Sequence, residues 1–196
     1  MTQHAPRKQA RQTRSIATQT AIIEAAAHIL EQHGAAALTT NAAAERAGVS
    51  IGSLYQYFPN KQSIIASLLR REWASMLDQI RTVSQSDLPP DEKLHRLIAI
   101  AIDHQFARPR LALELEYVES SLELSEEMQH LASSIAGEVR SVVRSFDPDA
   151  SPVIAADVVS ICRVLTNDAA MRGETDTQAV TRRVTRAVLG FLTYRE

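Results

Sequence analysis

Apolar residues recur every three to four positions along almost the whole chain, which is the spacing of helices with one apolar face. Gly, Pro and short Ser/Asp-rich stretches separate these segments, and none shows the two-residue alternation of a β-strand. The pattern predicts an all-α fold of about nine helices. We expect the first helix to run from Ser15 to His33, after a polar arm without secondary structure.

Residues that cap helix N-termini mark several of the later boundaries. Ser50, Asn60, Asp91, Ser125 and Ser151 each stand just before a segment with helical periodicity. A side-chain oxygen at such a position accepts a hydrogen bond from a free N–H group of the first turn. We therefore expect a helix to begin directly after each of these residues.

Two short predicted helices are joined by a tight turn at Gly48, as in a helix-turn-helix. The second lies in VSIGSLYQYFPNK, begins after Ser50 and stops before Pro59. Leu54 and Phe58 have the spacing of inward-facing residues, whereas the outward side lacks carboxylates and suits a DNA groove. A plain helical hairpin inside a bundle stays open as the alternative. The outward side is formed by Ile51, Gly52, Ser53, Gln56 and Tyr57, with Tyr55 at its edge.

Charge is distributed unevenly along the 196 residues, whose net charge is −2. The first 73 residues carry eight basic and four acidic side chains, whereas the remainder carry 13 and 19. This asymmetry indicates that only the front of the chain meets a polyanion. The polar arm holds four cations that could follow a DNA backbone, or could simply form a solvated tail. These cations are Arg7, Lys8, Arg11 and Arg14.

The stretch LTTNAAAERAGVSIGSLYQYFPNKQSIIASLL, from Leu38 to Leu69, strongly resembles the TetR family of transcriptional regulators. The matching pieces are TT, the AGVS turn, G-S-L-Y-x-Y-F and the N-K that follows. The resemblance implies an all-α homodimer with DNA-binding residues 1–60 and a ligand-binding, dimerising part at 61–196. It further implies a cytoplasmic repressor, not an enzyme, that binds a pseudo-palindromic operator and is released by a small-molecule effector.

The resemblance also assigns roles to single residues around the turn. Thr40 matches a phosphate contact and Asn41 a base or backbone contact, while Tyr55 and Lys61 match phosphate clamps. The recognition face corresponds to Ile51, Gly52, Ser53, Gln56 and Tyr57, and Arg14 belongs to the basic arm. One departure is Ser63, where the family often has a carboxylate. We expect this change to remove the capping partner of Asn60.

The second half of the chain supplies candidates for the dimer interface and for the effector pocket. The resemblance implies that the last two helices dimerise, through Ile154, Val158, Ile161, Leu165, Val184, Val188 and Phe191. Packing within one chain explains the same apolar stripes equally well. The candidate pocket residues, each of which would also suit a simple core, are Trp73, Met76, Leu77, Phe106, Tyr117, Met128 and Cys162. The expected effector is largely apolar, and no cofactor is expected.

Two Glu-x-x-His spacings raise an alternative from another class of protein. Glu92 with His95, and Glu127 with His130, have the spacing used by di-metal helical bundles that act as redox enzymes. Each pair lies in or near a first helical turn, where acidic residues are favoured anyway, so a solvated helix face is the preferred interpretation. A lone cysteine, Cys162, excludes an internal disulfide and fits a reducing cytosol.

Overall fold

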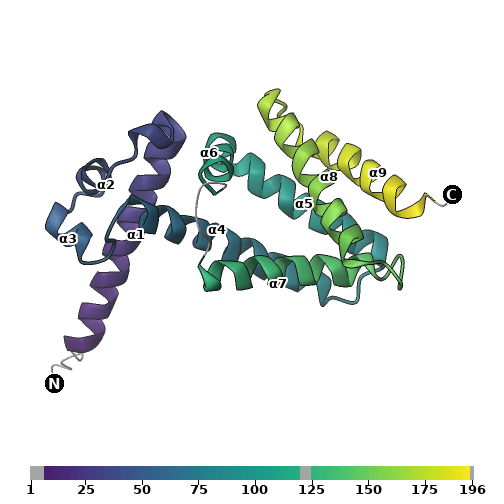
Figure 1. The fold of residues 1–196 in the computed structure, drawn as a ribbon, viewed down its shortest axis with the longest axis horizontal. Helices are drawn as coiled ribbons and strands as arrows, with labels where there is room; N and C mark the ends of the chain where they lie inside the picture. The colour runs from purple at the N-terminus through teal and green to yellow at the C-terminus, as the bar shows by residue number, and fades with distance from the viewer. Residues whose placement is uncertain (1–6, 120–124, 195–196) are drawn as a thin grey trace, which may run out of the picture. The chain divides into compact units, whose positions relative to one another are not determined.

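The computed structural model describes residues 7–119 and 125–194, with side chains from residue 12 onward. Over these residues the chain forms nine α-helices, one 3₁₀ turn and no strand, so the predicted all-α fold is confirmed (Figure 1). The elements are α1 (Arg7–His33), η1 (Ala35–Ala37), α2 (Thr40–Arg46), α3 (Ile51–Tyr55), α4 (Lys61–Ser84), α5 (Pro90–Ala107), α6 (Pro109–Glu119), α7 (Glu126–Val143), α8 (Pro152–Met171) and α9 (Thr177–Thr193). None of the described helices is long and apolar enough to span a membrane.

The described residues divide into two compact units. The first unit joins residues 7–69 with 113–119, and the second joins 70–112 with 125–194. Both α4 and α6 therefore contribute to the two units. The division of the chain into a DNA-binding part and a ligand-binding part at residue 60 stays a prediction. The two compact units are defined by packing alone, and neither corresponds to one continuous stretch of sequence.

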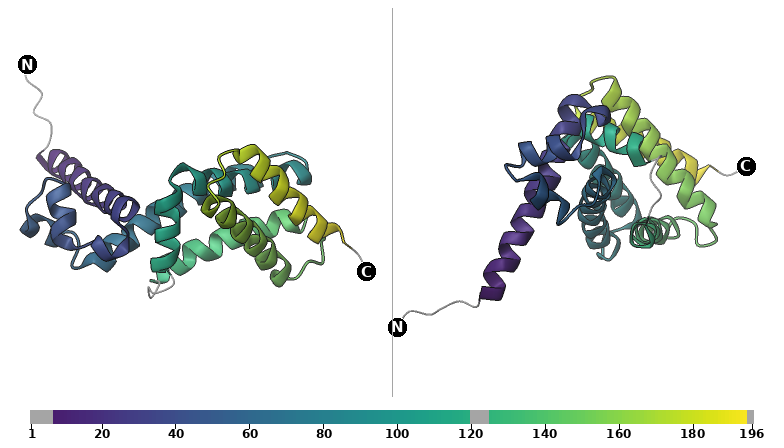
Figure 2. Two further views of the ribbon diagram at one scale, coloured as in Figure 1. Left: turned by 90° about the horizontal axis from the view of Figure 1, so that it is seen from above. Right: turned by 60° about the vertical axis from the view of Figure 1, so that its left-hand side comes forward.

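The first unit is built on α1, which packs against η1 and α2, while α2 packs against α3. Figure 2 shows α2 and α3 together beside α1. The core of this unit is mostly aliphatic and includes Ile22 and Leu30 of α1, Ala43 of α2 and Leu54 of α3, none of which is exposed at all. The small side chain of Ala43 lets α2 approach closely, since helix separation depends on the residues at the contact.

Helix α1 begins at Arg7, eight residues before the predicted start. The expectation of an arm without secondary structure up to Arg14 was therefore wrong. Residues 7–14 contain no glycine or proline, and Lys, Gln, Ala and Arg are good helix formers. Intrinsic propensity extends the helix here, although the apolar stripe on which the prediction rested begins only later in the sequence.

Most of the predicted caps are present. Ser50 accepts a hydrogen bond from the Ser53 amide at 3.1 Å, and Asn60 accepts one from the Ser63 amide at 2.9 Å. The prediction that Ser63 deprives Asn60 of a capping partner was wrong, because the Ser63 hydroxyl accepts from the Asn60 amide at 3.4 Å. The Asp91 cap was also wrong. Helix α5 begins at Pro90, two residues before the predicted start, and the missing N–H of Pro90 is tolerated in the first turn. Helix α8 begins directly after Ser151 as predicted, but the Ser151 side chain makes no capping hydrogen bond.

The second unit has its own core, formed by α5, α7, α8 and α9 with one residue of α4. Helix α9 packs against both α5 and α8, and α7 packs against α5 and α8. The buried residues include Ile102 of α5, Val158 of α8, and Val184 and Val188 of α9. Cys162 is buried in the same core, and burial raises the pKa of its thiol to about 11. It is a packing residue rather than a reactive one.

Candidate nucleic-acid interface

The turn between α2 and α3 is held by local hydrogen bonds. Thr39 caps α2 by accepting from the Ala42 amide at 3.1 Å, and Gly48 adopts the left-handed conformation with φ of 67°. An L side chain at Gly48 would be strained, so the glycine is needed for the turn itself. Ser50 then caps α3, and Leu54 anchors that helix in the core without any exposure.

The outward side of α3 is open to solvent, as a DNA-reading surface requires. Ile51 is 39% exposed, and Gly52 and Gln56 are also exposed, whereas Ser53 and Tyr57 are half-buried. The helix ends at Tyr55, earlier than the sequence predicts, so Gln56 and Tyr57 lie in the following turn. None of these residues is acidic, and the face therefore presents no charge that would repel phosphate.

One contact joins α2 to α3 across the turn. The hydroxyl of Thr40 lies 3.2 Å from the hydroxyl of Tyr55, although the two residues are fifteen positions apart. Tyr55 is 53% exposed, so its ring stands at the surface while its hydroxyl is held by α2. The contact orients two predicted phosphate-binding groups before any DNA arrives, which lowers the ordering cost of binding.

The remaining predicted DNA contacts lie on three other parts of the first unit. Asn41 is exposed on the first turn of α2, and Lys61 is the half-buried first residue of α4, directly after its cap. Arg14 is exposed on α1, where it belongs to a helix rather than to a loose arm. The side chains of Arg7, Lys8 and Arg11 lie outside the described residues.

The same segment matches a known family. Residues 22–68, which include α2, α3 and the first part of α4, match the model of bacterial regulatory proteins of the tetR family. Over these residues the chain matches the TetR family. A relative, the "Fatty acid metabolism regulator protein" of Bacillus subtilis (strain 168), is 28% identical over 115 residues, or 56% of this chain. The match spans 58% of that relative's length, less than two thirds.

Solved structures share the fold over almost the whole chain. The fatty acid degradation regulator FadR from Bacillus halodurans has a TM-score of 0.76 and 21% identity, covering 91% of this chain and 97% of that one. FadR from Bacillus subtilis in complex with stearoyl-CoA also has a TM-score of 0.76, with 18% identity, and covers 88% and 98%. At these identities the likeness shows a common fold.

A carboxylate of α6 contacts the start of η1, just after α1, within the first unit. Glu114 accepts a hydrogen bond from the Ala35 amide at 2.9 Å, in a half-buried position. Gly34 precedes this amide with φ of 77°, and a Cβ placed there would lie 3.3 Å from the Glu114 carboxylate. Thus α6 supplies the acceptor for a free N–H at the start of η1. Sequence reasoning missed this contact, because its partners are 79 residues apart.

The structure corrects part of the predicted TetR-type dimer interface. Val158, Val184 and Val188 are buried in the core of their own chain and are therefore not available to a second copy. Ile154, Ile161 and Leu165 are half-buried against the same core, and only Phe191 is exposed. The wide stripes on α8 and α9 mostly serve internal packing, which the sequence had left open.

The predicted pocket residues do not gather in one described cavity. Tyr117 is 74% exposed and belongs to the part of α6 in the first unit, so it departs most from the prediction. Leu77, Met128 and Cys162 are buried, whereas Trp73, Met76 and Phe106 are half-buried. Near them in the second unit, Glu72 accepts from Arg71 at 2.9 Å and lies 3.5 Å from His104. The pocket stays a prediction.

The residues of the di-metal alternative are engaged elsewhere. Glu92 pairs with Arg96 at 2.7 Å, and Glu127 pairs with Arg70 at 3.3 Å. Across the described parts of the chain, no three His, Cys, Asp or Glu side chains group as metal ligands would. The solvated-face interpretation of both Glu-x-x-His spacings accounts for these pairs.

Proposed function

We propose that the protein is a cytoplasmic, ligand-responsive transcriptional repressor that binds a pseudo-palindromic operator as a homodimer. The observation that carries this proposal is the outward side of α3, which has no carboxylate, follows the Ser50 cap and is pre-ordered by the contact between Thr40 and Tyr55. A short helix presented in this way fits a major groove, and flanking hydroxyls and cations fix its register on the phosphates.

The dimer interface that we propose uses the exposed side of α8 together with the end of α9. Val153, Val164 and Met171 of α8 are apolar and exposed by 64%, 54% and 72%. Their spacings of eleven and seven residues place them on one side of the helix. Phe191 and Tyr194 add exposed aromatic surface at the end of α9. Two copies related by a two-fold axis would bury these residues in a four-helix bundle.

The effector site that we propose lies inside the second unit. The amide nitrogen of Gln105, on α5, is buried and has no hydrogen-bond partner among the described residues. An unpaired buried donor is costly, and a ligand oxygen would satisfy it. Because a protein of similar fold binds stearoyl-CoA, a long-chain acyl thioester is the first effector to test.

The contact between Glu114 and Ala35 offers a route by which an effector could reach the DNA-binding surface. Helix α6 begins in the second unit and continues into the first, where Glu114 binds the first amide of η1, the turn that follows α1. An effector that favours a different placement of α6 would disturb this hydrogen bond, and with it the position of α1 against α2. The released form would then bind the operator less well.

Operator binding is tested by footprinting the DNA and then measuring affinity by fluorescence anisotropy over a range of salt concentrations. Lys61→Gln should weaken binding and lower the salt slope by about one phosphate contact. Tyr55→Phe should weaken it several-fold by removing one hydroxyl. The control is Arg144→Gln, which neutralises an exposed cation of the second unit. Equal losses in all three variants would refute the assignment of the surface.

Dimerisation and release need separate measurements. Val164→Glu should yield monomers in sedimentation, because it places a charge within the proposed apolar interface, and a persistent dimer would exclude this side of α8. Palmitoyl-CoA should dissociate the operator complex whereas CoA alone should not. If both compounds leave the complex intact, the acyl effector is wrong, while the DNA-binding proposal still stands on its own measurements.

A further inference from the structure

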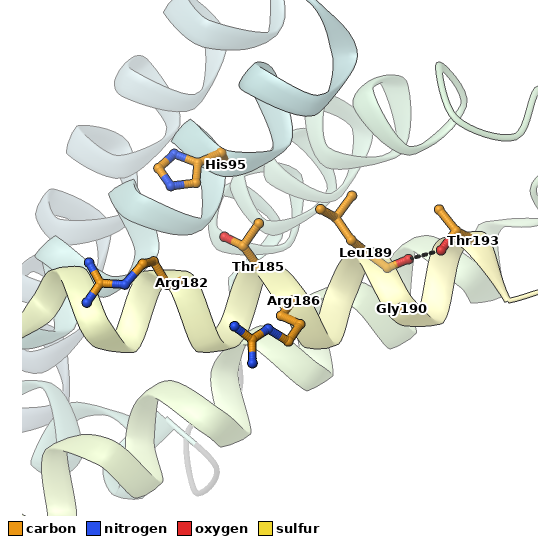
Figure 3. Close-up of a pocket in the computed structure, with 7 residues that line it drawn as sticks. All are labelled: His95, Arg182, Thr185, Arg186, Leu189, Gly190 and Thr193. Atoms are coloured by element: carbon orange, nitrogen blue, oxygen red, sulfur yellow. Dashed lines mark hydrogen bonds between the residues drawn. The ribbon is translucent and has the colours of Figure 1, made fainter.

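A groove outside the helical core lies between α5 and α9 in the second unit (Figure 3). It has a volume of about 510 Å³, which is larger than a simple inorganic ion needs. In Figure 3, Thr185 and Leu189 point from α9 toward α5, where His95 lies opposite, and Arg186 extends from another side of α9. The groove is lined by His95, Arg182, Thr185, Arg186, Leu189, Gly190 and Thr193, and none of these is acidic.

The two arginines of the groove stand out from other arginines nearby. Arg182 and Arg186 lie one helical turn apart and are exposed, and neither makes a hydrogen bond or ion pair with its side chain among the described residues. By contrast, Arg183 donates to both oxygens of Glu174 at 3.0 Å. The groove therefore holds two uncompensated guanidinium groups whose forked donors match a carboxylate or a phosphate.

A buried hydroxyl at the floor of the groove also lacks a partner. Thr181 and Thr193 on the same helix donate to the carbonyl four residues earlier, both at 2.8 Å. The hydroxyl of Thr185 makes no such bond, although it is buried, and it has no other partner among the described residues. An unpaired buried hydroxyl costs free energy that a bound acceptor would recover.

The groove also has an apolar and open part. Leu189 lies between the polar residues, and a Cβ on Gly190 would meet no other part of the described chain within 4 Å beyond its sequence neighbours and the adjoining backbone of α9. The aliphatic stems of the arginines extend this surface, as such side chains commonly do. On α5, the carboxylate of Glu92, three residues before His95, is already paired with Arg96 and does not neutralise the groove.

We infer that the groove between α5 and α9 binds a small amphiphilic anion, with its carboxylate or phosphate on Arg182, Arg186 and Thr185 and its apolar body along Leu189. This site is separate from the effector pocket proposed inside the unit and from the dimer surface. Leu189 and Phe191 are two residues apart on α9 and therefore point to nearly opposite sides of the helix. The inference does not depend on operator binding.

The test measures the affinity of the full chain for decyl phosphate, decanoate and uncharged decanol by calorimetry. Wild type should bind at least one of the two anions about tenfold more tightly than decanol, since a charge-assisted hydrogen bond is worth at least that factor. The better anion identifies the head group. Arg182→Gln with Arg186→Gln should remove this preference, whereas Arg183→Gln, whose arginine is already paired, should retain it. Thr185→Val should weaken the anion several-fold.

The position of the ligand is read independently by chemical protection. Phenylglyoxal modifies exposed arginines, and mass spectrometry reports which ones have reacted. The bound anion should protect Arg182 and Arg186 and leave Arg183 reactive. The inference is overturned if neither anion is preferred to decanol, or if Arg183→Gln is as damaging as the double variant. It is also overturned if Thr185→Val binds like wild type, or if the two groove arginines stay unprotected.

Discussion

Replacing Gly52 by alanine should change the stability of the protein and its affinity for the operator in opposite directions. A Cβ at Gly52 would have only the Ser50 hydroxyl near it, at 4.0 Å, and its φ is not in the left-handed region. Alanine therefore fits the folded chain. By lowering the entropy of the unfolded chain, it should raise the free energy of unfolding by about 0.4–1 kcal/mol. In a chain of this size that corresponds to roughly 1–4 °C in Tm.

The same methyl group should weaken operator binding. Gly52 lies on the exposed side of α3, where we propose that the backbone comes close to the DNA. An extra carbon in a closely packed contact costs about 1 kcal/mol or more. Since the homodimer that we propose presents two copies, the expected loss is about 2 kcal/mol, or about thirtyfold in Kd. The variant should thus be more stable and yet bind its operator more weakly.

The assay combines thermal unfolding with fluorescence anisotropy on the footprinted operator at one salt concentration. Gly137→Ala is the matched control, because Gly137 lies inside α7 and also has open space around its Cβ position. It should gain comparable stability with unchanged operator affinity. If Gly52→Ala is stabilised and binds as tightly as wild type, the reasoning that the glycine allows close approach is refuted.

Three further predictions concern stability and reactivity. Gly34→Ala should lower the free energy of unfolding by about 1–2 kcal/mol in denaturant titration, because φ is 77° and the Glu114 carboxylate is 3.3 Å from the new Cβ. The Cys162 thiol, whose pKa burial raises to about 11, should stay unmodified by iodoacetamide at pH 7 until the protein unfolds. Fast labelling of the native protein would contradict its burial. The hydrogen bond from Arg183 lowers the pKa of Glu174, so its stabilising effect is present above about pH 4.5 and lost as the pH falls further. Glu174→Gln should flatten Tm against pH in that acid range, and an unchanged profile would argue against the pair.

Helix caps and turns that depend on a few neighbouring residues were mostly predicted correctly from the sequence. Ser50 and Asn60 cap the helices that follow them, and Gly48 has the left-handed turn expected of it, because each depends on a few neighbouring residues. The Asp91 cap was wrong because Pro90 opens α5 two residues before the predicted start and places Asp91 inside the first turn. The start of α1 was misplaced because helix propensity persists beyond the apolar stripe.

The parts that were missed depend on contacts between residues far apart in the chain. A periodic apolar stripe on α9 predicts burial, but it does not say whether a neighbouring helix or a second copy covers it. Val184 therefore turned out to be core, although it was assigned to the dimer interface. Likewise, nothing near Thr185 in the sequence indicates that His95 lies across the groove from it. Such pairings become visible only when the helices are in place.

Residues 113–119 of α6 belong to the first unit although they follow part of the second unit in the sequence. This order constrains where the gene for this protein could recombine with a related gene. A crossover near residue 60 or 70 would join one protein's α1–α3 to a foreign α6, and Ala35 would face whatever replaces Glu114. Buried Leu115 and Val118 belong to the same returning segment. We therefore expect an exchanged N-terminal part to keep its packing only when residues 113–119 are transferred with it, because this compact unit is discontinuous in the sequence.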